Sequence, residues 1–600
     1  MLGGYGTLAP YSEEVRMSGE DSTVGGGRDN EASGDFSTVS GGIRNTAEGE
    51  ASTSSGGRFN RANGRDSTTS GGNGNQAHGN LSTVGGGLRH VVMGHSATVG
   101  GGINNRAQGI SSTVAGGGQS EHLSRGGNHA LGDFSTICGG GWNRVTGKHG
   151  SIGGGHSNSV EKEYATVSGG VQNTAAGERA TVSGGEDNTA SAIRATIGGG
   201  SDNIAQHRSS TIAGGGDNTT SGNSATVSGG VLNEAGGEAV VGGGRENKAN
   251  GRHATVSGGV ENIAAGTRSV IGGGEGNVVL STTGHATVAG GLNNSIHGIR
   301  AVIGGGSDNR AHGFRATVGG GGNNRAGGNN SFIGGGLQNR ASGDFSIISG
   351  GRGNFTNGTA GGSTISGGLN NRTDGGTSTV AGGRSNAARG TASFAAGTQA
   401  NAAHDGAFVW GDTTSTEVAS TDSNQFIVRA SGGLWFGTTS EPDLSRGFLN
   451  TSTGGFLSEG GAWTNASSVE SKKDFEAVDP TDILESVRTL PIASWQYTEE
   501  KGTRHIGPTA EAFHRAFGVS YTDSISTVDA DGVALAAIQA LAEKFDQKDE
   551  RATDLERTTV ELHEENDKLK EENTRLQKQY DELAGRIDVV EDRLAETVAN

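Results

Sequence analysis

The residues best suited to covalent chemistry lie close together at the start of the last quarter of the chain. The stretch SSVESKK (467–473) holds three serines and two lysines. A Ser hydroxyl is a weak nucleophile that needs a neighbouring base, and a Lys amine can serve when desolvation lowers its pKa towards neutrality. A Ser five residues before a Lys carries no signal by its spacing alone. The stretch therefore marks only where such chemistry could occur.

Other chemistry-bearing residues favour structural roles. The one cysteine, Cys138, fills a position that Ser, Gly or Ala occupies elsewhere, so we interpret it as a small packing residue. A glycan hydrolase needs paired carboxylates in a cleft, and no such pair stands out. The calcium-binding signature G-G-x-G-x-D does not recur. We therefore expect no metal, no cofactor and no external substrate.

A fifteen-residue repeat fills residues 21–401, in about 25 units of the form [ST]-T-[VI]-x-G-G-x-x-N-x-A-x-G-x-x. His90 fills one Asn position, and an insertion from Gln119 to Ala130 breaks the count once. We expect the asparagines to stack as a structural ladder whose side-chain amides bond along the stack. The ladder includes Asn30, Asn45, Asn60, Asn75, Asn105, Asn158, Asn173, Asn188 and Asn203.

Each repeat predicts one coil of a parallel β-solenoid with two short strands. Alternation in S-T-V places Val on one face and Thr on the other. The Gly-Gly pair permits φ > 0 at a corner, and later glycines such as Gly34 and Gly49 can turn the chain again. At about 4.8 Å per coil the array would be a rod on the order of 120 Å long.

Each coil offers few apolar groups, only Val or Ile and one Ala. We expect this to be too little for a core within one chain, so that several copies must pack side by side. The repeat resembles the heads of trimeric autotransporter adhesins, which are left-handed parallel β-rolls. That resemblance implies a homotrimeric shaft.

The composition excludes several classes. Gly makes up 114 of 600 residues without a G-X-Y period, which excludes collagen. The formal net charge of −18 argues against a nucleic-acid partner. No apolar stretch reaches transmembrane length and no signal peptide is recognisable, so we expect no membrane insertion. Residues 1–20 read equally well as an attachment segment or a frayed end.

Residues 402–466 contain short β-prone runs rich in aromatic side chains. Two interpretations stay open for this neck: a compact β cap, or a carbohydrate-binding surface. The aromatic residues concerned are Phe408, Trp410, Phe426, Trp435 and Phe436.

Residues 467–548 change character again. A helix is predicted from Pro480 to Leu490 with Asp479 as N-cap, followed by a strand in IASWQY. A buried helix is predicted further on, around VALAAIQAL. NASSVESKKDF, LPIASWQY, RHIGPTAEAF and STVDADGVALAAIQAL resemble the intramolecular chaperone auto-processing domain that ends phage tail spikes and fibres, the endosialidase type. We expect a small α+β domain.

The resemblance implies that this domain trimerises the fibre, assists its folding and then cleaves itself off in a single turnover. Ser467 would attack the carbonyl of Ala466 with Lys472 as base, and His505 would assist. Val469, Ser471 and Glu511 depart from the family's usual residues, and Ser468, Ser471 and Lys473 compete with the dyad. An uncleaved, purely structural domain is the alternative.

Residues 549–600 carry six heptads and predict a coiled coil. Two asparagines at position a favour a dimer by the simple rule, whereas both resemblances imply a trimer. The d positions are Leu555, Leu562, Leu569, Leu576, Leu583 and Val590, and the a positions are Thr559, Asn566, Asn573, Tyr580, Ile587 and Leu594.

These features together predict a mainly β, trimeric fibre or spike of a phage tail or phage-like contractile injection particle. It would assemble in the host cytoplasm, attach to a baseplate or tail, and bind a cell-surface glycan or protein in the released particle. The alternative is a surface adhesin of the autotransporter kind, which predicts an export signal and a membrane barrel. An ice-binding solenoid, suggested by the row of Thr residues, would leave the chaperone and coil unexplained.

Overall fold

The computed structural model describes residues 15–118, 126–438, 442, 444–500, 502–555, 567–583 and 585. The chain divides into two compact units, one ending at Arg429 and the other beginning at Ala430. We describe each unit by itself.

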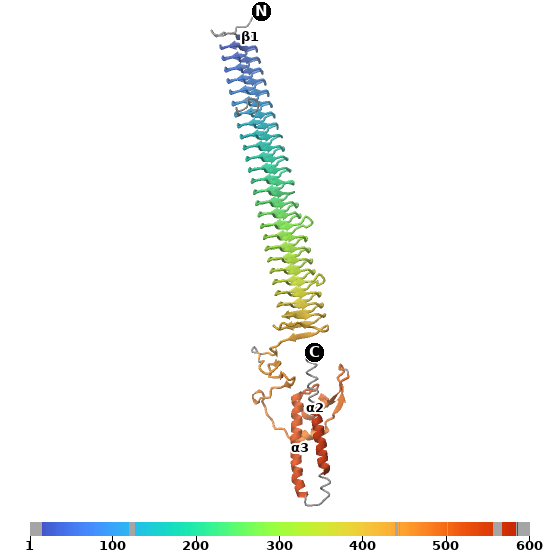
Figure 1. Ribbon diagram of the computed structural model, residues 1–600. Helices are drawn as coiled ribbons and strands as arrows, with labels where there is room; N and C mark the ends of the chain where they lie inside the picture. Colours follow the sequence, from blue (N-terminus) through green and yellow to red (C-terminus); the bar gives the residue numbers. More distant parts are fainter. Residues whose placement is uncertain are drawn as a thin grey trace. The chain divides into compact units, whose positions relative to one another are not determined.

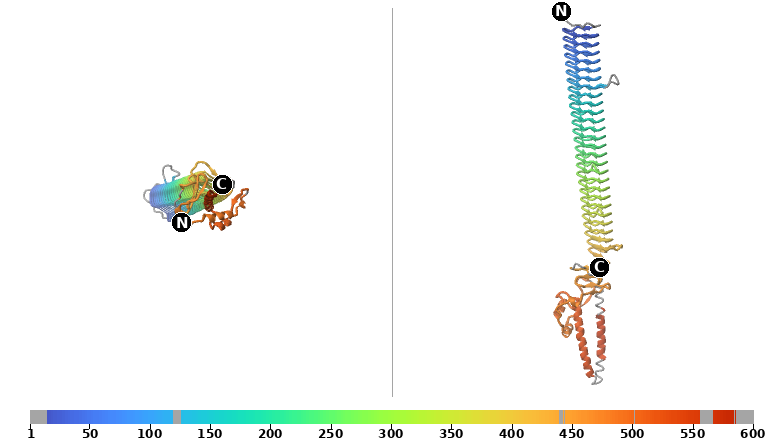
Figure 2. Two further views of the ribbon diagram at one scale, coloured as in Figure 1. Left: turned by 90° about the horizontal axis from the view of Figure 1, so that it is seen from below. Right: turned by 90° about the vertical axis from the view of Figure 1, so that its left-hand side faces the viewer.

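The first unit is a parallel β-solenoid (Figures 1 and 2). Odd-numbered strands from β1 (Val15–Met17) to β53 (Val418–Ala419) form one sheet, here sheet A. Even-numbered strands from β2 (Thr23–Val24) to β54 (Phe426–Arg429) form the other, sheet B. Most strands have only two residues, as in β4 (Thr38–Val39) and β5 (Thr46–Ala47). A third row of single bridges, such as Arg28 with Ile43, completes each coil.

The register stacks like residues on like. In sheet B, Thr23 pairs with Thr38 and Val24 with Val39. Val24 and Val39 are fully buried, whereas the Thr side chains face outward and are half-buried. The predicted alternation is confirmed, because a parallel in-register ladder repeats each side-chain direction from coil to coil.

The expectation that a coil cannot enclose its own core is wrong. Buried Val, Ile and Ala side chains of the array are 0 % exposed within a single chain. Much of the remaining interior is polar, with Asn45 and Ser52 also at 0 %. The prediction counted only apolar area, but hydrogen-bonded Asn side chains fill part of the coil, as Asn45 does through its bonds to Gly41 and Gly57. The small Ser52 hydroxyl is enclosed without a hydrogen-bond partner. Trimer formation therefore does not follow from the core and stays a prediction.

The glycines act differently at the two corners. Gly57 has a φ of +88°, and a Cβ there would lie 2.2 Å from the carbonyl oxygen of Gly72 in the next coil. This confirms the predicted corner. Gly49 has no positive φ; it is required because a Cβ would lie 2.0 Å from the next coil's carbonyl oxygen. The left-handed residue of that turn is Ala51, with a φ of 54°.

The solenoid reaches beyond the predicted limits of 21 and 401. β1 pairs with β3 (Asn30–Ala32), while residues 1–14 lie outside the described part of the chain. At the other end, β50 (Phe394–Gly397), β52 (Phe408–Gly411) and β54 stack in register. Their phenylalanines, Phe394, Phe408 and Phe426, stack at 4.7 Å between ring centroids on the outer face. The sequence motif of the repeat is lost here, but the coil geometry persists because the inward residues remain small or β-branched.

None of the five neck aromatics is buried: Phe426 is 70 % exposed and Phe436 58 %, and the others are half-buried. They do not form the core of a cap, whereas the sugar-binding alternative stays a prediction. Past the solenoid lies a four-stranded sheet of β55 (Leu434–Phe436), β56 (Leu449–Thr451), β57 (Phe456–Leu457) and β58 (Trp463–Thr464).

The rest of the second unit is α+β. It contains the 3₁₀ helix η1 (Val469–Ser471), α1 (Pro480–Thr489), α2 (Ala510–Phe517) and α3 (Thr527–Leu555), with an antiparallel pair β59 (Ala493–Trp495) and β60 (His505–Gly507). Asp479 caps α1 as predicted, because its carboxylate accepts from the Thr481 N–H at 2.8 Å. α1 contacts α3.

Within α3 the predicted buried face is wrong. Ala537 and Ala540 are buried, but Leu535 is 64 % exposed and Ile538 38 %. The apolar stripe that contacts the rest of this chain is built from small residues, which leaves the larger ones in solvent. No described helix has the length and apolarity to cross a bilayer.

Residues 567–583 are helical, and Leu569, Leu576, Tyr580 and Leu583 on this segment are exposed. The coiled coil itself stays a prediction. Several heptad positions lie outside the described residues, namely Leu562, Ile587, Val590, Leu594, Thr559 and Asn566.

Candidate functional site

The segment after β58 brings Ser467 and Lys472 together. Lys472 Nζ lies 2.8 Å from Ser467 Oγ. The five-residue separation is closed by η1, whose single tight turn reverses the chain between the two residues. Ser–Lys contact at this distance is what base-assisted attack by a serine requires.

The competing residues have other partners. Ser468 is the N-cap of η1, and its Oγ accepts from the Glu470 N–H at 3.2 Å. Ser471 Oγ donates to the Ser468 carbonyl at 2.7 Å. Lys473 Nζ lies 4.0 Å from Asp474. The local geometry thus distinguishes Ser467 and Lys472 from their neighbours, which the sequence could not do.

The Ser–Lys pair is open to water in a single chain. Ala466, Ser467 and Lys472 are all exposed. In this contact Lys472 Nζ donates to the Ser467 hydroxyl. A general base must instead be the neutral amine and accept the hydroxyl proton. Burial is what favours the neutral form of a lysine. Ser467 and Lys472 are thus in contact and exposed, and their catalytic role stays a prediction.

His505 occupies a separate cluster on β60. Its Nε2 lies 2.9 Å from Glu500 Oε2, and its ring stacks on Trp495 at 4.9 Å between centroids. Tyr497 lies against the same ring at 5.3 Å. No interaction among the described residues joins His505 to the Ser–Lys pair. Its assisting role stays a prediction.

Comparison with known families supports the assignment of this region. Residues 467–519 match the family model described as chaperone of endosialidase. This segment is an endosialidase-type chaperone domain. The match begins at Ser467, the predicted nucleophile. A search of curated proteins found no match. The predicted resemblance extended to about residue 545, and its last part, STVDADGVALAAIQAL, lies outside the matched segment.

The asparagine ladder of the solenoid that precedes the chaperone domain has a structural role. Asn45 is typical: its Nδ2 donates to the carbonyls of Gly41 at 2.9 Å and Gly57 at 3.0 Å, and its Oδ1 accepts from the Asn60 N–H at 3.0 Å. The predicted amide-to-amide bonds occur only in some coils, as from Asn188 to Asn173 at 3.0 Å. The side chain mainly bonds backbone groups at the glycine corner, namely two part-buried carbonyls and the buried N–H of the next ladder residue.

Every predicted ladder residue lies in this position and is at most 1 % exposed: Asn30, Asn45, Asn60, Asn75, Asn105, Asn158, Asn173, Asn188 and Asn203. Sequence reasoning missed Asn128 and Asn143. The ladder continues at Asn128 after the insertion, because the Asn128 N–H donates to Asn105 Oδ1 at 2.8 Å. The fifteen-residue spacing from Asn128 to Asn143 was the available signal.

His90 replaces Asn in one coil and is fully buried. Its Nδ1 accepts from the Asn105 N–H at 3.0 Å, while Nε2 has no hydrogen-bond partner of normal geometry. Burial lowers the pKa of His90 to about 4, against smaller opposing contributions from the backbone of Gly102 and Asn105. No cluster of metal-binding side chains occurs among the described residues.

Proposed function

We propose that the protein is a homotrimeric fibre or spike of a phage tail or phage-like contractile particle, with a solenoid shaft and a self-cleaving chaperone domain. The observation that carries this proposal is the 2.8 Å Ser467–Lys472 contact at the first residue of the matched domain, directly after a β-solenoid and neck. The shaft binds a cell-surface glycan or protein, and a baseplate or tail holds the fibre.

Self-cleavage follows from the dyad by a balanced sequence. Neutral Lys472 takes the proton of Ser467 Oγ, which attacks the carbonyl carbon of Ala466. The bond from that carbon to the Ser467 nitrogen breaks, and Lys472 returns the proton to this nitrogen. The acyl group is then an ester on Ser467 Oγ, which water hydrolyses to a carboxylate at Ala466 and a free amine at Ser467.

Two surface features support assembly into a trimer. The outward row that begins each described strand of sheet B contains no charged residue from Thr23 to Phe426. Sheet A carries Glu, Lys and Arg at the matching positions, such as Glu31 and Arg61. Depletion of charge is typical of the centre of protein interfaces. Leu569, Leu576 and Leu583 add an exposed apolar heptad row.

Association also supplies what the dyad lacks. Sister chains that pack against residues 466–472 would exclude water from Lys472 and favour its neutral amine. Cleavage would then follow assembly and would release the chaperone domain only from correctly folded fibres.

Expression of the full chain beside two variants tests this function. The wild type is expected to yield fragments 1–466 and 467–600 on denaturing electrophoresis, the second beginning at Ser467 by intact mass. Ser467→Ala and Lys472→Ala should stay whole, and Lys473→Ala, the matched control, should be cut. A wild type that stays whole, or a Ser467→Ala variant cut at the same bond, contradicts the assignment.

A further inference from the structure

A row of arginines crosses consecutive coils on the outer face of sheet A. Arg310 in β39 (Arg310–Ala311) pairs in register with Arg325 in β41 (Arg325–Ala326), and Arg325 with Arg340 in β43 (Arg340–Ala341). Phe355 in β45 (Phe355–Thr356) follows, then Arg372 in β47 (Arg372–Thr373). The arginines are exposed and Phe355 is half-buried. We call these five residues the arginine row.

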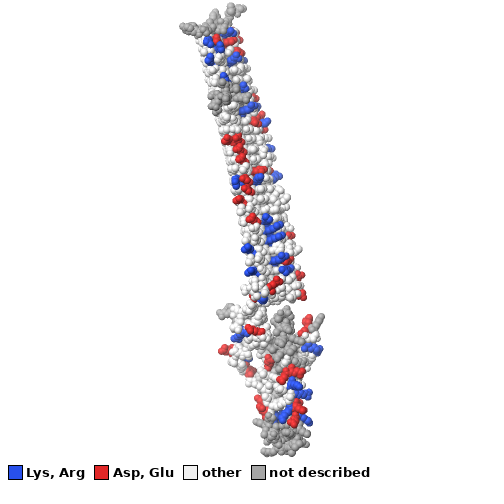
Figure 3. Space-filling model, viewed as in Figure 1, with Lys and Arg blue, Asp and Glu red and all other residues white. Residues whose placement is uncertain are grey.

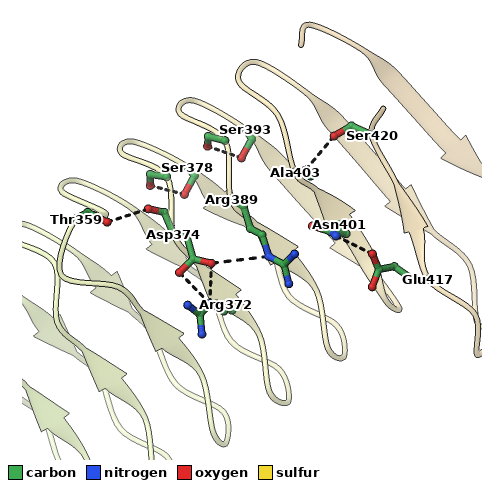
Figure 4. Close-up of polar contacts among 12 residues, drawn as sticks. Thr359, Arg372, Asp374, Ser378, Arg389, Ser393, Asn401, Ala403, Glu417 and Ser420 are labelled. Atoms are coloured by element: carbon green, nitrogen blue, oxygen red, sulfur yellow. Dashed lines mark hydrogen bonds and ion pairs between the residues drawn. The ribbon is translucent and has the colours of Figure 1, made fainter. Parts of the chain in front are cut away.

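The charge of this row is compensated only at its C-terminal end. Arg372 Nε lies 2.7 Å from Asp374, and Arg389 approaches the same carboxylate at 3.8 Å (Figure 4). Neither Arg310 nor Arg325 forms an ion pair within the described part of the chain. Lys and Arg side chains gather over these coils in Figure 3.

Like charges directly opposite each other destabilise neighbouring strands, here at about 4.8 Å spacing. Other coils of the same solenoid place an acid beside an exposed arginine, as Arg252 with Glu238 at 3.0 Å and Arg44 with Asp29 at 3.2 Å. Within the described part of sheet A, only this row places arginines at the same outward position in three consecutive coils. A bound anion would remove the repulsion.

Two imidazoles extend the surface beside the row. His297 and His312 stack at 4.2 Å between ring centroids, two residues beyond Ser295 and Arg310. Burial, then His297 and the nearby arginines Arg325 and Arg310, lowers the pKa of His312 to about 4. These rings are hydrogen-bonding groups at neutral pH and leave the positive charge to the guanidinium groups.

Phe355 lies between two guanidinium groups. The Arg340 and Arg372 Cζ atoms lie 5.5 and 5.0 Å from its ring centroid. These cation–π contacts hold the aromatic ring in line with the charges. An apolar ring face beside polar donors is the combination that suits a sugar ring.

We propose that the arginine row binds a linear polysaccharide that carries carboxylate groups, laid along the solenoid axis. Arg310, Arg325 and Arg340 bind successive carboxylates through paired N–H donors. Phe355 packs against a sugar ring, and His297 and His312 contact hydroxyl groups. This inference rests on the proposed function, since it specifies the chemistry of the surface glycan that the fibre recognises.

A nucleic acid fits the row less well. The formal net charge of −18 repels any long polyanion outside the row, so it does not distinguish a nucleic acid from an acidic polysaccharide. Binding of single strands, however, relies on several aromatic platforms in succession, and the row has one. A polymer of spaced carboxylates meets the arginines without needing further stacking sites.

Binding of immobilised polygalacturonic acid to the purified full chain tests the proposal, with neutral dextran and oligo(dT) as comparison polymers. The wild type should bind polygalacturonic acid, more weakly as salt rises, and bind the other two polymers less. The double variant Arg310→Gln/Arg325→Gln should lose about tenfold in affinity, as expected for lost charge-assisted hydrogen bonds.

The matched control is Arg61→Gln/Arg144→Gln. These arginines occupy the same outward position of sheet A, but their in-register neighbours are not arginines. Equal losses in both double variants, no binding by the wild type, or stronger binding of oligo(dT) would overturn the proposal. Circular dichroism melting of each variant shows that the fold is kept.

The self-cleavage assay on the same preparations separates the two hypotheses. If the chain cleaves itself but does not bind polygalacturonic acid, the fibre assignment is retained and binding by the arginine row is refuted. A chain that binds the polymer but stays whole supports the row and contradicts the chaperone chemistry.

Discussion

Replacing His90 by Asn tests how the ladder holds the coils together. The neighbouring Asn75 shows what an Asn contributes in this position: its Nδ2 donates to the carbonyls of Gly71 at 2.7 Å and Gly87 at 3.1 Å. His90 has no such pair of bonds, and its buried Nε2 forms no hydrogen bond of normal geometry. The variant should restore the corner and stabilise the coil against local opening by about 1–3 kcal/mol at neutral pH.

The difference in stability between His90→Asn and the wild type should grow in acid. The pKa of His90 is about 4 in the folded chain, below its ordinary value of 6.5. Between these values the unfolded chain binds more protons, so stability falls as the pH falls through this window and is fully retained above it. At about 1.4 kcal/mol per pKa unit, the added penalty reaches about 3 kcal/mol near pH 4.

Hydrogen exchange with mass-spectrometric detection measures this opening in peptides that cover residues 75–105. His90→Asn should protect these amides more than the wild type at pH 7, and by a larger factor at pH 4.5. His95→Asn, which replaces an exposed histidine of the same coil, serves as control and should change neither value. Equal protection of the wild type and His90→Asn at both pH values would refute the reasoning.

Three further substitutions, one of them a control, probe the coil geometry by thermal unfolding. Gly140→Ala should destabilise the solenoid by roughly 2 kcal/mol or more, because φ is +84° and a Cβ would lie 1.9 Å from the next coil's carbonyl. Gly139→Ala, which meets nothing within 4 Å, should be nearly neutral, and equal effects would contradict the corner assignment. Asn188→Ala should cost roughly 2 kcal/mol, because it removes the bonds to the Gly184 and Gly200 carbonyls and leaves the buried Asn203 N–H without its acceptor, although the Gly200 carbonyl keeps its bond from the Glu186 N–H. A neutral result would show that water replaces the ladder.

The stacked coil was predictable because each repeat contacts its next copy. Thr over Thr and Val over Val need only the fifteen-residue period and the two-residue alternation of a strand. The self-enclosed core was not predictable from apolar content. Asn45 fills part of the interior as a buried polar group, and its contribution depends on hydrogen-bond geometry that composition does not reveal.

Ser467 and Lys472 were predicted as a dyad by resemblance, and the structure shows how their neighbours differ from them. Ser468 and Ser471 are committed to the turn of η1, a fact that depends on the backbone of three residues. The arginine row could not be predicted from the charge composition, for a different reason. A net charge averages over the chain, whereas the solenoid brings Arg310, Arg325 and Arg340 onto one face.

The native mass of the Ser467→Ala variant tests the central claim most directly, because this variant should keep the chain whole. Sedimentation at micromolar concentration should give three times the mass of the 60.2 kDa chain. A stable species with the mass of one chain, carrying an intact solenoid, would contradict the trimeric fibre.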